Sequence, residues 1–174
     1  MKISGYKLID RLEELKEQAK NVDAQFASSL HKFNEETDTS STATPQEIMQ
    51  KYEELQTKIG KLQEAQSVYN MKVRVKFQNE ALTLNRAIKE YGSLGRVKNQ
   101  WKTATVAANS RSAYYGLELA RSKEQIYAVR TISIENASTL YEAANKRVGL
   151  LKQAIRSGNA TEINVEMDET AFED

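Results

Sequence analysis

The first 34 residues carry apolar or small side chains at alternating steps of four and three residues. The series is Leu8, Leu12, Leu15, Ala19, Val22, Phe26 and Phe33, with Ser29 at the one position that breaks it. A period of about 3.5 residues places these positions on one stripe of a helix, which must pack against another helix. The pattern predicts a helix from about Ile3 to Asn34.

A polar linker, Glu35 to Thr44, precedes a second heptad series. Thr44 can cap a helix, Pro45 suits the first helical position, and Glu47 can complete a capping box. The series that follows is Ile48, Tyr52, Leu55, Ile59, Leu62, Gln66 and Tyr69. Two heptad helices joined by a short linker predict an antiparallel hairpin.

Three segments favour strands instead. Residues 71–77 alternate apolar and basic side chains, and residues 162–167 alternate apolar and acidic ones, which is the two-residue period of a strand. Opposite charges across an antiparallel pair are stabilising, so we expect these two segments to pair. Residues 126–133 are β-branched and apolar enough to join them.

Two further helices are predicted between the strands. The first covers about 79–108, with a stripe that consists of Leu84, Ile88, Tyr91, Leu94, Val97, Trp101, Ala104 and Ala108. The second starts near Ser133 or Glu135 and ends near Arg156, before Ser157-Gly158, a typical helix stop; its stripe consists of Leu140, Ala144, Val148, Leu151 and Ile155. Residues 109–123 have no clear period, so an ordered loop and a short helix both remain open.

These elements predict a mainly α fold of long, heptad-patterned antiparallel helices with a small accessory antiparallel β-sheet. We expect a single helical domain over 1–167 and an acidic, frayed tail over 168–174. The chain has no cysteine, which indicates a reducing compartment, and no apolar run near the roughly 20 residues that cross a bilayer. We therefore expect a cytoplasmic protein with no membrane contact.

Charge is segregated along the chain. Residues 1–71 hold 9 Lys and Arg against 12 Asp and Glu, residues 72–130 hold 12 against 4, and residues 131–174 hold 4 against 8. The chain is thus acidic, basic and acidic in turn, although its net charge is +1. A duplex-binding domain usually carries a net basic charge, so we expect no nucleic-acid partner.

The order of elements resembles a family of small, uncharacterised helical bacterial proteins described as septicolysin-like. The resemblance lies in the opening helix (KLIDRLEELKEQ), the Pro-started helix (TPQEIMQKYEELQTKIGKLQEA), the VYN turn and the closing segment (IYAVRTISIENASTLYEAANKRVGLLKQAI). It covers most of the chain as a pattern, but the double arginine of that family's third helix is here Asn85-Arg86-Ala87-Ile88. The resemblance implies a helical, oligomeric protein and brings no assigned activity.

No catalytic motif is present, and we expect no enzyme activity and no cofactor. His31 is the single histidine, so with no cysteine the usual zinc sites are excluded. Exposed carboxylate pairs such as Glu13 and Glu17 are typical of a solvated helix face. Gly92 and Gly95 lie inside a predicted helix, without the strand-turn-helix setting of a phosphate loop.

The central basic segment mixes cations with aromatic rings, a combination that suits an anion bearing a base. Arginine binds phosphate oxygens bidentately, and aromatic rings stack on bases. The candidate ligand-binding residues are Arg111, Tyr114, Tyr115, Arg121, Tyr127 and Arg130. Arg111, Arg121 and Arg130 would bind phosphate, and Tyr114 or Tyr115 would stack on the base. Trp101 lies on a helix stripe and is more typical of core packing.

Two classes of function fit this pattern. The first is a homo-oligomeric, non-enzymatic protein that captures a small phosphorylated, nucleotide-like ligand. By analogy it could be a phage-encoded factor that sequesters a nucleotide signal of bacterial immunity. The second is a coiled-coil assembly module without a ligand, in which the basic residues would be consumed in ion pairs with the acidic segments.

Overall fold

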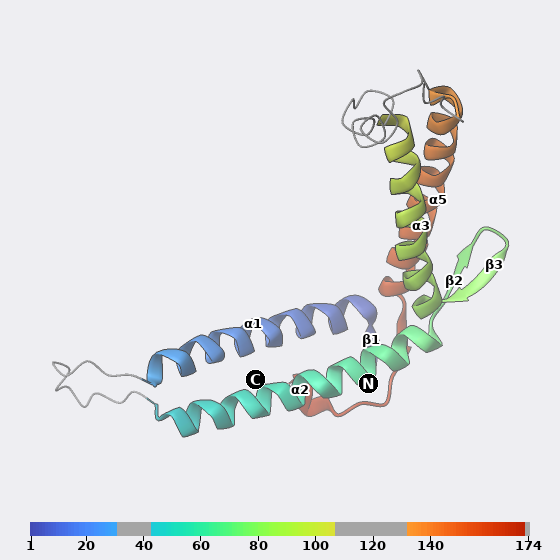
Figure 1. The fold of residues 1–174 in the computed structure, drawn as a ribbon. Coiled ribbons are helices and arrows are strands. Elements are labelled where there is room, and N and C mark those ends of the chain that lie inside the picture. Colours follow the sequence, from blue (N-terminus) through green and yellow to red (C-terminus); the bar gives the residue numbers. More distant parts are fainter. Residues whose placement is uncertain (31–42, 107–131, 173–174) are drawn as a thin grey trace, which may run out of the picture. The chain divides into compact units, whose positions relative to one another are not determined.

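The computed structural model describes residues 1–30, 43–106 and 132–172, and it is mainly helical with short antiparallel strands (Figure 1). The elements are β1 (Lys2–Ser4), α1 (Gly5–Ser29), α2 (Pro45–Lys72), β2 (Arg74–Phe77), β3 (Glu80–Thr83), α3 (Leu84–Val106), α5 (Ile134–Ala160), β4 (Glu162–Asn164) and the 3-10 helix η2 (Glu169–Phe172). These elements confirm the predicted fold class. They form two compact units where one domain was expected: unit 1 is Met1–Arg74 with Ser157–Asp174, and unit 2 is Val75–Arg156.

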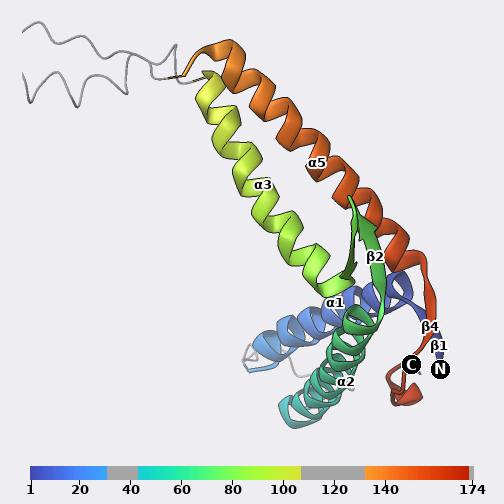
Figure 2. The ribbon, with the colours of Figure 1, turned by 90° about the vertical axis from the view of Figure 1, so that its right-hand side faces the viewer.

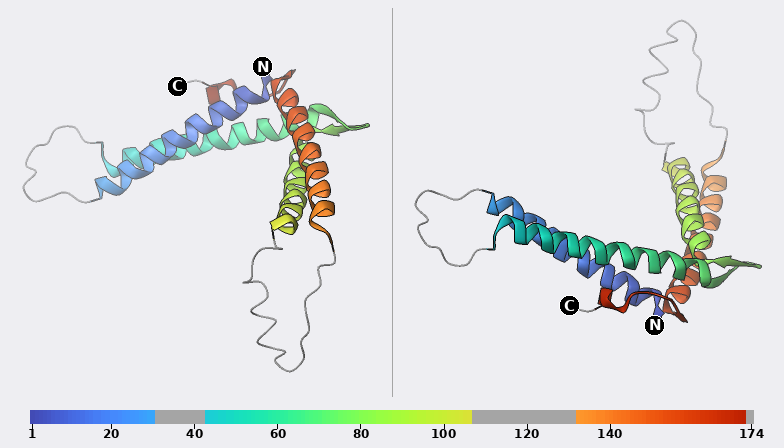
Figure 3. Two further views of the ribbon diagram at one scale, coloured as in Figure 1. Left: turned by 90° about the horizontal axis from the view of Figure 1, so that it is seen from above. Right: turned by 90° about the horizontal axis from the view of Figure 1, so that it is seen from below.

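The core of unit 1 is the hairpin of α1 and α2, which lie side by side (Figures 1 and 3). The heptad stripes predicted this packing correctly. The buried side chains of α1 include Leu8, Leu12, Leu15, Ala19 and Val22, and those of α2 include Ile48, Leu55, Ile59, Leu62 and Tyr69. Ser29 and Phe26 are only half-buried near the end of α1, and Phe33 lies outside the described residues.

The start of α2 is the predicted capping box. The Glu47 N–H donates to the Thr44 hydroxyl (3.3 Å), and the Thr44 N–H donates to the Glu47 carboxylate (2.7 Å). Hydrogen bonds from the Thr44 backbone and hydroxyl lower the pKa of the Glu47 carboxyl. Pro45 occupies the first turn, where its missing N–H needs no partner.

The strand pairing differs from the prediction. β4 pairs with β1, residue by residue from Lys2 opposite Asn164 to Ser4 opposite Glu162, and β2 pairs with β3. The expected pairing of 71–77 with 162–167 is therefore wrong. The cation that Glu162 contacts is Lys2, at 3.3 Å, and the two residues lie diagonally across the β1–β4 pair, since Ser4 is the residue opposite Glu162.

β2 finds its partner locally. A two-residue turn, Gln78-Asn79, leads directly into β3, and Gln78 adopts a positive φ of 54°. Such tight hairpins need a positive φ in the turn, which is costly for a residue other than glycine. Residues 71 and 72 remain in α2, while the later apolar positions of this segment, Val75 and Phe77, are buried.

The C-terminal segment is held against the hairpin of unit 1 (Figure 3). Met1 and Val165 exchange two backbone hydrogen bonds of 3.0 Å. Beyond them, Lys61 forms an ion pair of 2.6 Å with Asp168, and the buried Arg11 guanidinium donates to the Ala171 carbonyl (3.4 Å). Residues 168–172, for which we expected a frayed tail, thus form hydrogen bonds and a short helix in the structure.

Tyr69 joins the end of α2 to the end of α5. Its side chain is completely buried, and its hydroxyl lies 2.7 Å from the Gly158 carbonyl and 2.6 Å from the Thr161 carbonyl. Gly5 leaves room for this contact between the ends of α2 and α5, which we call the Tyr69 joint. A Cβ at Gly5 would lie 2.8 Å from the Tyr69 ring and 2.7 Å from the Asn159 amide oxygen. The predicted helix stop at Ser157-Gly158 is wrong: α5 continues to Ala160, and Gly158 is buried in it.

In unit 2, α3 and α5 run side by side (Figure 2). α3 begins at Leu84 and not near residue 79, because 80–83 belong to β3; the Thr83 hydroxyl accepts from the Arg86 N–H (3.1 Å). The predicted stripes hold only in part. Ile88, Val97 and Leu140 are 42%, 47% and 40% exposed, whereas Ala144, Val148 and Leu151 of α5 are buried. The strand expected at 126–133 falls mostly outside the described residues.

Candidate functional site

The predicted ligand-binding residues cannot be compared with the structure. Arg111, Tyr114, Tyr115, Arg121, Tyr127 and Arg130 all lie outside the described residues, as does His31. Their sequence position places them between α3 and α5, the two long helices of unit 2. The described parts of those helices carry the further candidate residues of this site.

Unit 2 collects the positive charge of the chain. Its sequence, Val75–Arg156, contains 14 Lys and Arg against 6 Asp and Glu, whereas unit 1 contains 11 against 18. The three sequence segments used above to count charge hid part of this separation. Segment 131–174 contains both the basic residues of α5 and the acidic residues after Ser157, so their charges partly cancel in its total. The cations of α5 were missed for that reason, and a division near Gly158 would have revealed them.

Most cations of α3 and α5 form no ion pair with any carboxylate in the part of the chain that the structure describes. They are Lys89, Arg96, Lys98 and Lys102 on α3, and Lys146, Arg147, Lys152 and Arg156 on α5. All are exposed except Lys98, which is half-buried. Arg96 donates only to the Ser93 hydroxyl (3.1 Å), a neutral acceptor. Among the described residues, no carboxylate competes with an external anion for these side chains.

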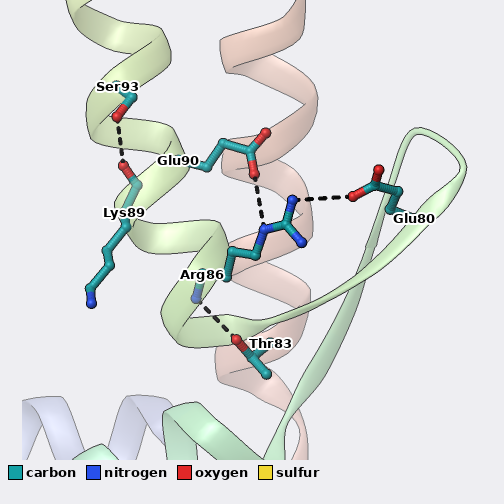
Figure 4. A network of polar contacts seen from close by, with 6 residues as sticks. All are labelled: Glu80, Thr83, Arg86, Lys89, Glu90 and Ser93. Carbon is teal, nitrogen blue, oxygen red and sulfur yellow. Dashed lines mark hydrogen bonds and ion pairs between the residues drawn. The ribbon is translucent and has the colours of Figure 1, made fainter.

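Arg86 is the exception on α3 (Figure 4). Its guanidinium lies 3.4 Å from a Glu80 oxygen on β3 and 3.9 Å from a Glu90 oxygen one turn along the helix. With 63% of the Arg86 side chain exposed, such pairs contribute little to stability. They do hold this guanidinium beside the β2–β3 hairpin, and in Figure 4 Lys89 points away from the cluster.

In the described parts of α3 and α5, three aromatic rings accompany the cations. Tyr91 and Trp101 on α3 and Tyr141 on α5 are each half-buried. From Ile88 to Thr105, no side chain of α3 is fully buried, so this helix offers partly accessible rings between cations. Trp101 therefore has one part packed and one part exposed to a partner or ligand.

Two grooves flank the α1–α2 hairpin of unit 1. The larger, of about 510 Å³, has a floor that includes Leu15 and Leu55 and a rim of mixed charge. Its rim includes Arg11, Lys51 and Lys58 together with Glu14 and Glu54. The other, of about 360 Å³, is lined by Lys16, Lys20, Asp23 and Tyr52 among others. Their mixed charge makes both less suited to an anion than the cations of unit 2.

Other kinds of site are not found in the described ranges. Residues 1–30, 43–106 and 132–172 contain no cluster of His, Asp and Glu that could hold a metal ion. Within the same ranges, no helix is both long enough and apolar enough to cross a membrane.

Comparison with known proteins shows the fold and nothing beyond it. No protein-family profile matches the chain, and no curated protein matches it significantly. Among solved structures, the chain is similar to the crystal structure of a functionally unknown conserved protein from Corynebacterium diphtheriae. The TM-score is 0.68 at 19% sequence identity, over 94% of this chain and 100% of that one. At this identity the likeness shows a shared helical fold, and the septicolysin-like resemblance stays a prediction.

Proposed function

We propose that this protein works without catalysis, as an oligomeric helical protein that captures a small phosphorylated, nucleotide-like ligand on its basic unit. Sequestration of a nucleotide signal, as in phage-encoded inhibitors of bacterial immunity, is the biological setting that we propose for this capture.

One observation carries the proposal: apart from Arg86, the cations of α3 and α5 form no ion pair with a carboxylate within the described residues. An assembly module whose charged segments merely neutralise one another would use these cations in ion pairs. Uncompensated like charges on neighbouring helices repel one another, so an anion that binds among them removes this repulsion. The half-buried rings of Tyr91, Trp101 and Tyr141 add surfaces on which a base can stack.

The roles of individual residues follow from their chemistry. Arg111, Arg121 and Arg130 would bind phosphate oxygens, since a guanidinium offers two parallel N–H donors to one phosphate. Tyr114, Tyr115 or Tyr127 would stack on the base. The unpaired lysines and arginines of α3 and α5 would raise the local concentration of the anion.

The second candidate is the assembly module without a small ligand. The exposed apolar side chains of unit 2 favour it, namely Ile88, Val97, Ile134, Leu140 and Leu150. The two functions differ in one measurable respect, since only the first requires a stoichiometric small molecule.

Isothermal titration calorimetry with mono-, di- and cyclic nucleotides tests the proposal. We expect at least one nucleotide to bind, and we expect Arg111→Ala with Arg121→Ala to weaken it by about tenfold or more, because charge-assisted hydrogen bonds to phosphate are lost. The control is Lys16→Ala with Lys51→Ala, which removes the same charge from unit 1 and should leave binding unchanged. If no nucleotide in the panel binds the folded protein, ligand capture is wrong and the assembly module remains.

A further inference from the structure

One side of α3 combines an exposed apolar side chain with cations that have no carboxylate partner in the described residues. At 100° per residue, Ile88, Lys89, Gly92, Arg96 and Lys102 fall within an arc of roughly 140°. We call these five residues the basic face. Ile88 is 42% exposed, and the three cations are exposed as well.

The glycine in the basic face is not required by packing inside the chain. A Cβ at Gly92 would meet only a guanidinium nitrogen of Arg96, at 3.9 Å, and a Cβ at the neighbouring Gly95 would meet nothing within 4 Å. Glycine destabilises the interior of a helix relative to alanine, and its usual compensation is close approach of another backbone. Gly5 has that compensation within the chain, whereas Gly92 has open space above it, as Gly60, Gly95 and Gly149 do, and on the basic face this space leaves room for a partner.

A surface of opposite charge exists in unit 1 of the same chain. The described segment Ser157–Phe172 contains Glu162, Glu166, Asp168 and Glu169 and no lysine or arginine. The β1–β4 pairing and the Lys61–Asp168 ion pair hold this segment in place. Tyr6, 41% exposed, follows β1 in the first turn of α1. We call Tyr6, Glu162, Glu166 and Glu169 the acidic patch. Glu162 contacts Lys2 at 3.3 Å and Glu169 lies 4.0 Å from the N-terminal ammonium, exposed pairs that contribute little, and Glu166 has no cation partner among the described residues.

We propose that the basic face of one copy of this chain docks on the acidic patch of a second copy. Opposite charges steer and orient the contact, and Ile88 and Tyr6 supply apolar surface that is removed from water. Docking of one basic face on another would instead bring Lys89, Arg96 and Lys102 against their own copies. The interface is therefore heterologous, and repeated head-to-tail contacts close into a ring or extend as a filament. This inference does not depend on ligand capture, which can use the cations outside the basic face, namely Lys98 on α3 and Lys146, Arg147, Lys152 and Arg156 on α5.

The charge of the two surfaces fixes the sign of the salt dependence. An interface between opposite charges weakens as ionic strength rises, because the Debye length shortens from about 30 Å at 0.01 M salt to about 10 Å at 0.1 M. An interface that buries apolar surface between two basic faces would strengthen instead. Light scattering of the full chain at both ionic strengths should show larger assemblies at the lower one.

A mixing experiment tests the proposal most sharply. Variant A carries Lys89→Glu and Arg96→Glu, and variant B carries Glu166→Lys and Glu169→Lys. Each variant alone should be monomeric at concentrations where the wild type assembles, with association weakened by at least about tenfold. An equimolar mixture should assemble again, because the basic face of B fits the acidic patch of A, and the reversed face of A, now acidic, fits the reversed patch of B, now basic.

Two controls keep the result interpretable. Lys16→Glu with Lys51→Glu changes the net charge as variant A does, but away from the basic face, and should assemble as the wild type does. Gly92→Leu should block assembly while the helical circular dichroism is retained, whereas Gly60→Leu, at an equally open glycine of α2, should not. The proposal is wrong if the wild type is monomeric or if variant B assembles on its own. It is also wrong if the mixture of A and B stays monomeric, or if the two glycine substitutions have equal effects.

Discussion

Replacing Tyr69 with phenylalanine isolates the joint between the ends of α2 and α5. The substitution keeps the fully buried ring and removes only its hydroxyl, which lies 2.7 Å from the Gly158 carbonyl and 2.6 Å from the Thr161 carbonyl. The Thr161 residue is exposed, so water can replace the hydroxyl there. Gly158 is buried, and its carbonyl would lose the Tyr69 hydroxyl while it keeps the backbone N–H of Thr161 at 3.1 Å.

The loss should destabilise unit 1 by about 1 kcal/mol, the usual net contribution of one intramolecular hydrogen bond, because both carbonyls keep another partner. For a chain of this size, 1 kcal/mol corresponds to about 2–4 °C in Tm, so we expect a fall of about 2–4 °C. Differential scanning calorimetry at neutral pH measures it directly. Tyr52→Phe is the matched control, since Tyr52 is half-buried on the same helix and its hydroxyl donates to no atom of the described residues.

A second readout comes from alkaline pH. Burial raises the pKa of the Tyr69 phenol, although a backbone hydrogen bond from Gly5 opposes this shift. A group held neutral in the folded state contributes stability that is lost as pH rises above its ordinary pKa, about 10. The stability difference between wild type and Tyr69→Phe should therefore shrink above pH 10. A Tm change below about 1 °C at neutral pH, or a difference that grows at alkaline pH, would refute this account of the joint.

Four further substitutions test other parts of the fold. Gly5→Ala should destabilise unit 1 by about 1–3 kcal/mol in chemical denaturation, because the added methyl group overpacks the joint, and a neutral effect would contradict the close approach. Thr44→Ala should cost about 1 kcal/mol by removing the cap of α2, and rescue by Ser but not Val would confirm the hydroxyl as the cause. Gln78→Gly should stabilise the β2–β3 hairpin by roughly 1 kcal/mol, since glycine tolerates the positive φ; a loss of stability would show that this backbone conformation is wrong. Hydrogen bonds, first from Lys61 and then from Thr170, hold the pKa of the Asp168 carboxyl well below its usual value. The contribution of this carboxylate to the stability of the folded state is therefore present above about pH 4 and is lost as the pH falls further. Hydrogen exchange of residues 165–172 should accelerate only below that pH in the wild type but already at pH 7 in Asp168→Asn.

The hairpin of unit 1 could be predicted because its signals are local and agree with one another. The heptad stripes of α1 and α2 each need one partner helix, and the linker between them is too short and polar to offer another arrangement. The capping box of Thr44 and Glu47 fixes the start of α2 independently of any tertiary contact.

The strand partners and the end of α5 could not be predicted because both are decided by tertiary contacts. Glu162 needs a cation across the strand, and the sequence offered Arg74 and Lys76 as readily as Lys2. Gly158 has the local signature of a helix stop, but its carbonyl accepts from Tyr69, which lies 89 residues earlier in the chain.

The sequence predicted that the candidate site is positively charged, but it did not predict how the charged side chains are arranged. The cations of α3 were evident in the central basic segment, whereas those of α5 were concealed by averaging with the acidic residues after Ser157. Whether a given cation is paired depends on the fold, and Arg86 with its two glutamates differs in this respect from its neighbour Lys89. Only the folded structure shows which of these cations has a carboxylate partner and which has none among the described residues.

Native mass spectrometry of the full chain with an equimolar mixture of mono-, di- and cyclic nucleotides tests the central claim most directly. The account predicts that the assembly retains one nucleotide species in a fixed ratio to the subunits, and that Arg111→Ala with Arg121→Ala loses it. A spectrum unchanged by the mixture, from protein whose circular dichroism shows it folded, would contradict ligand capture by the basic unit.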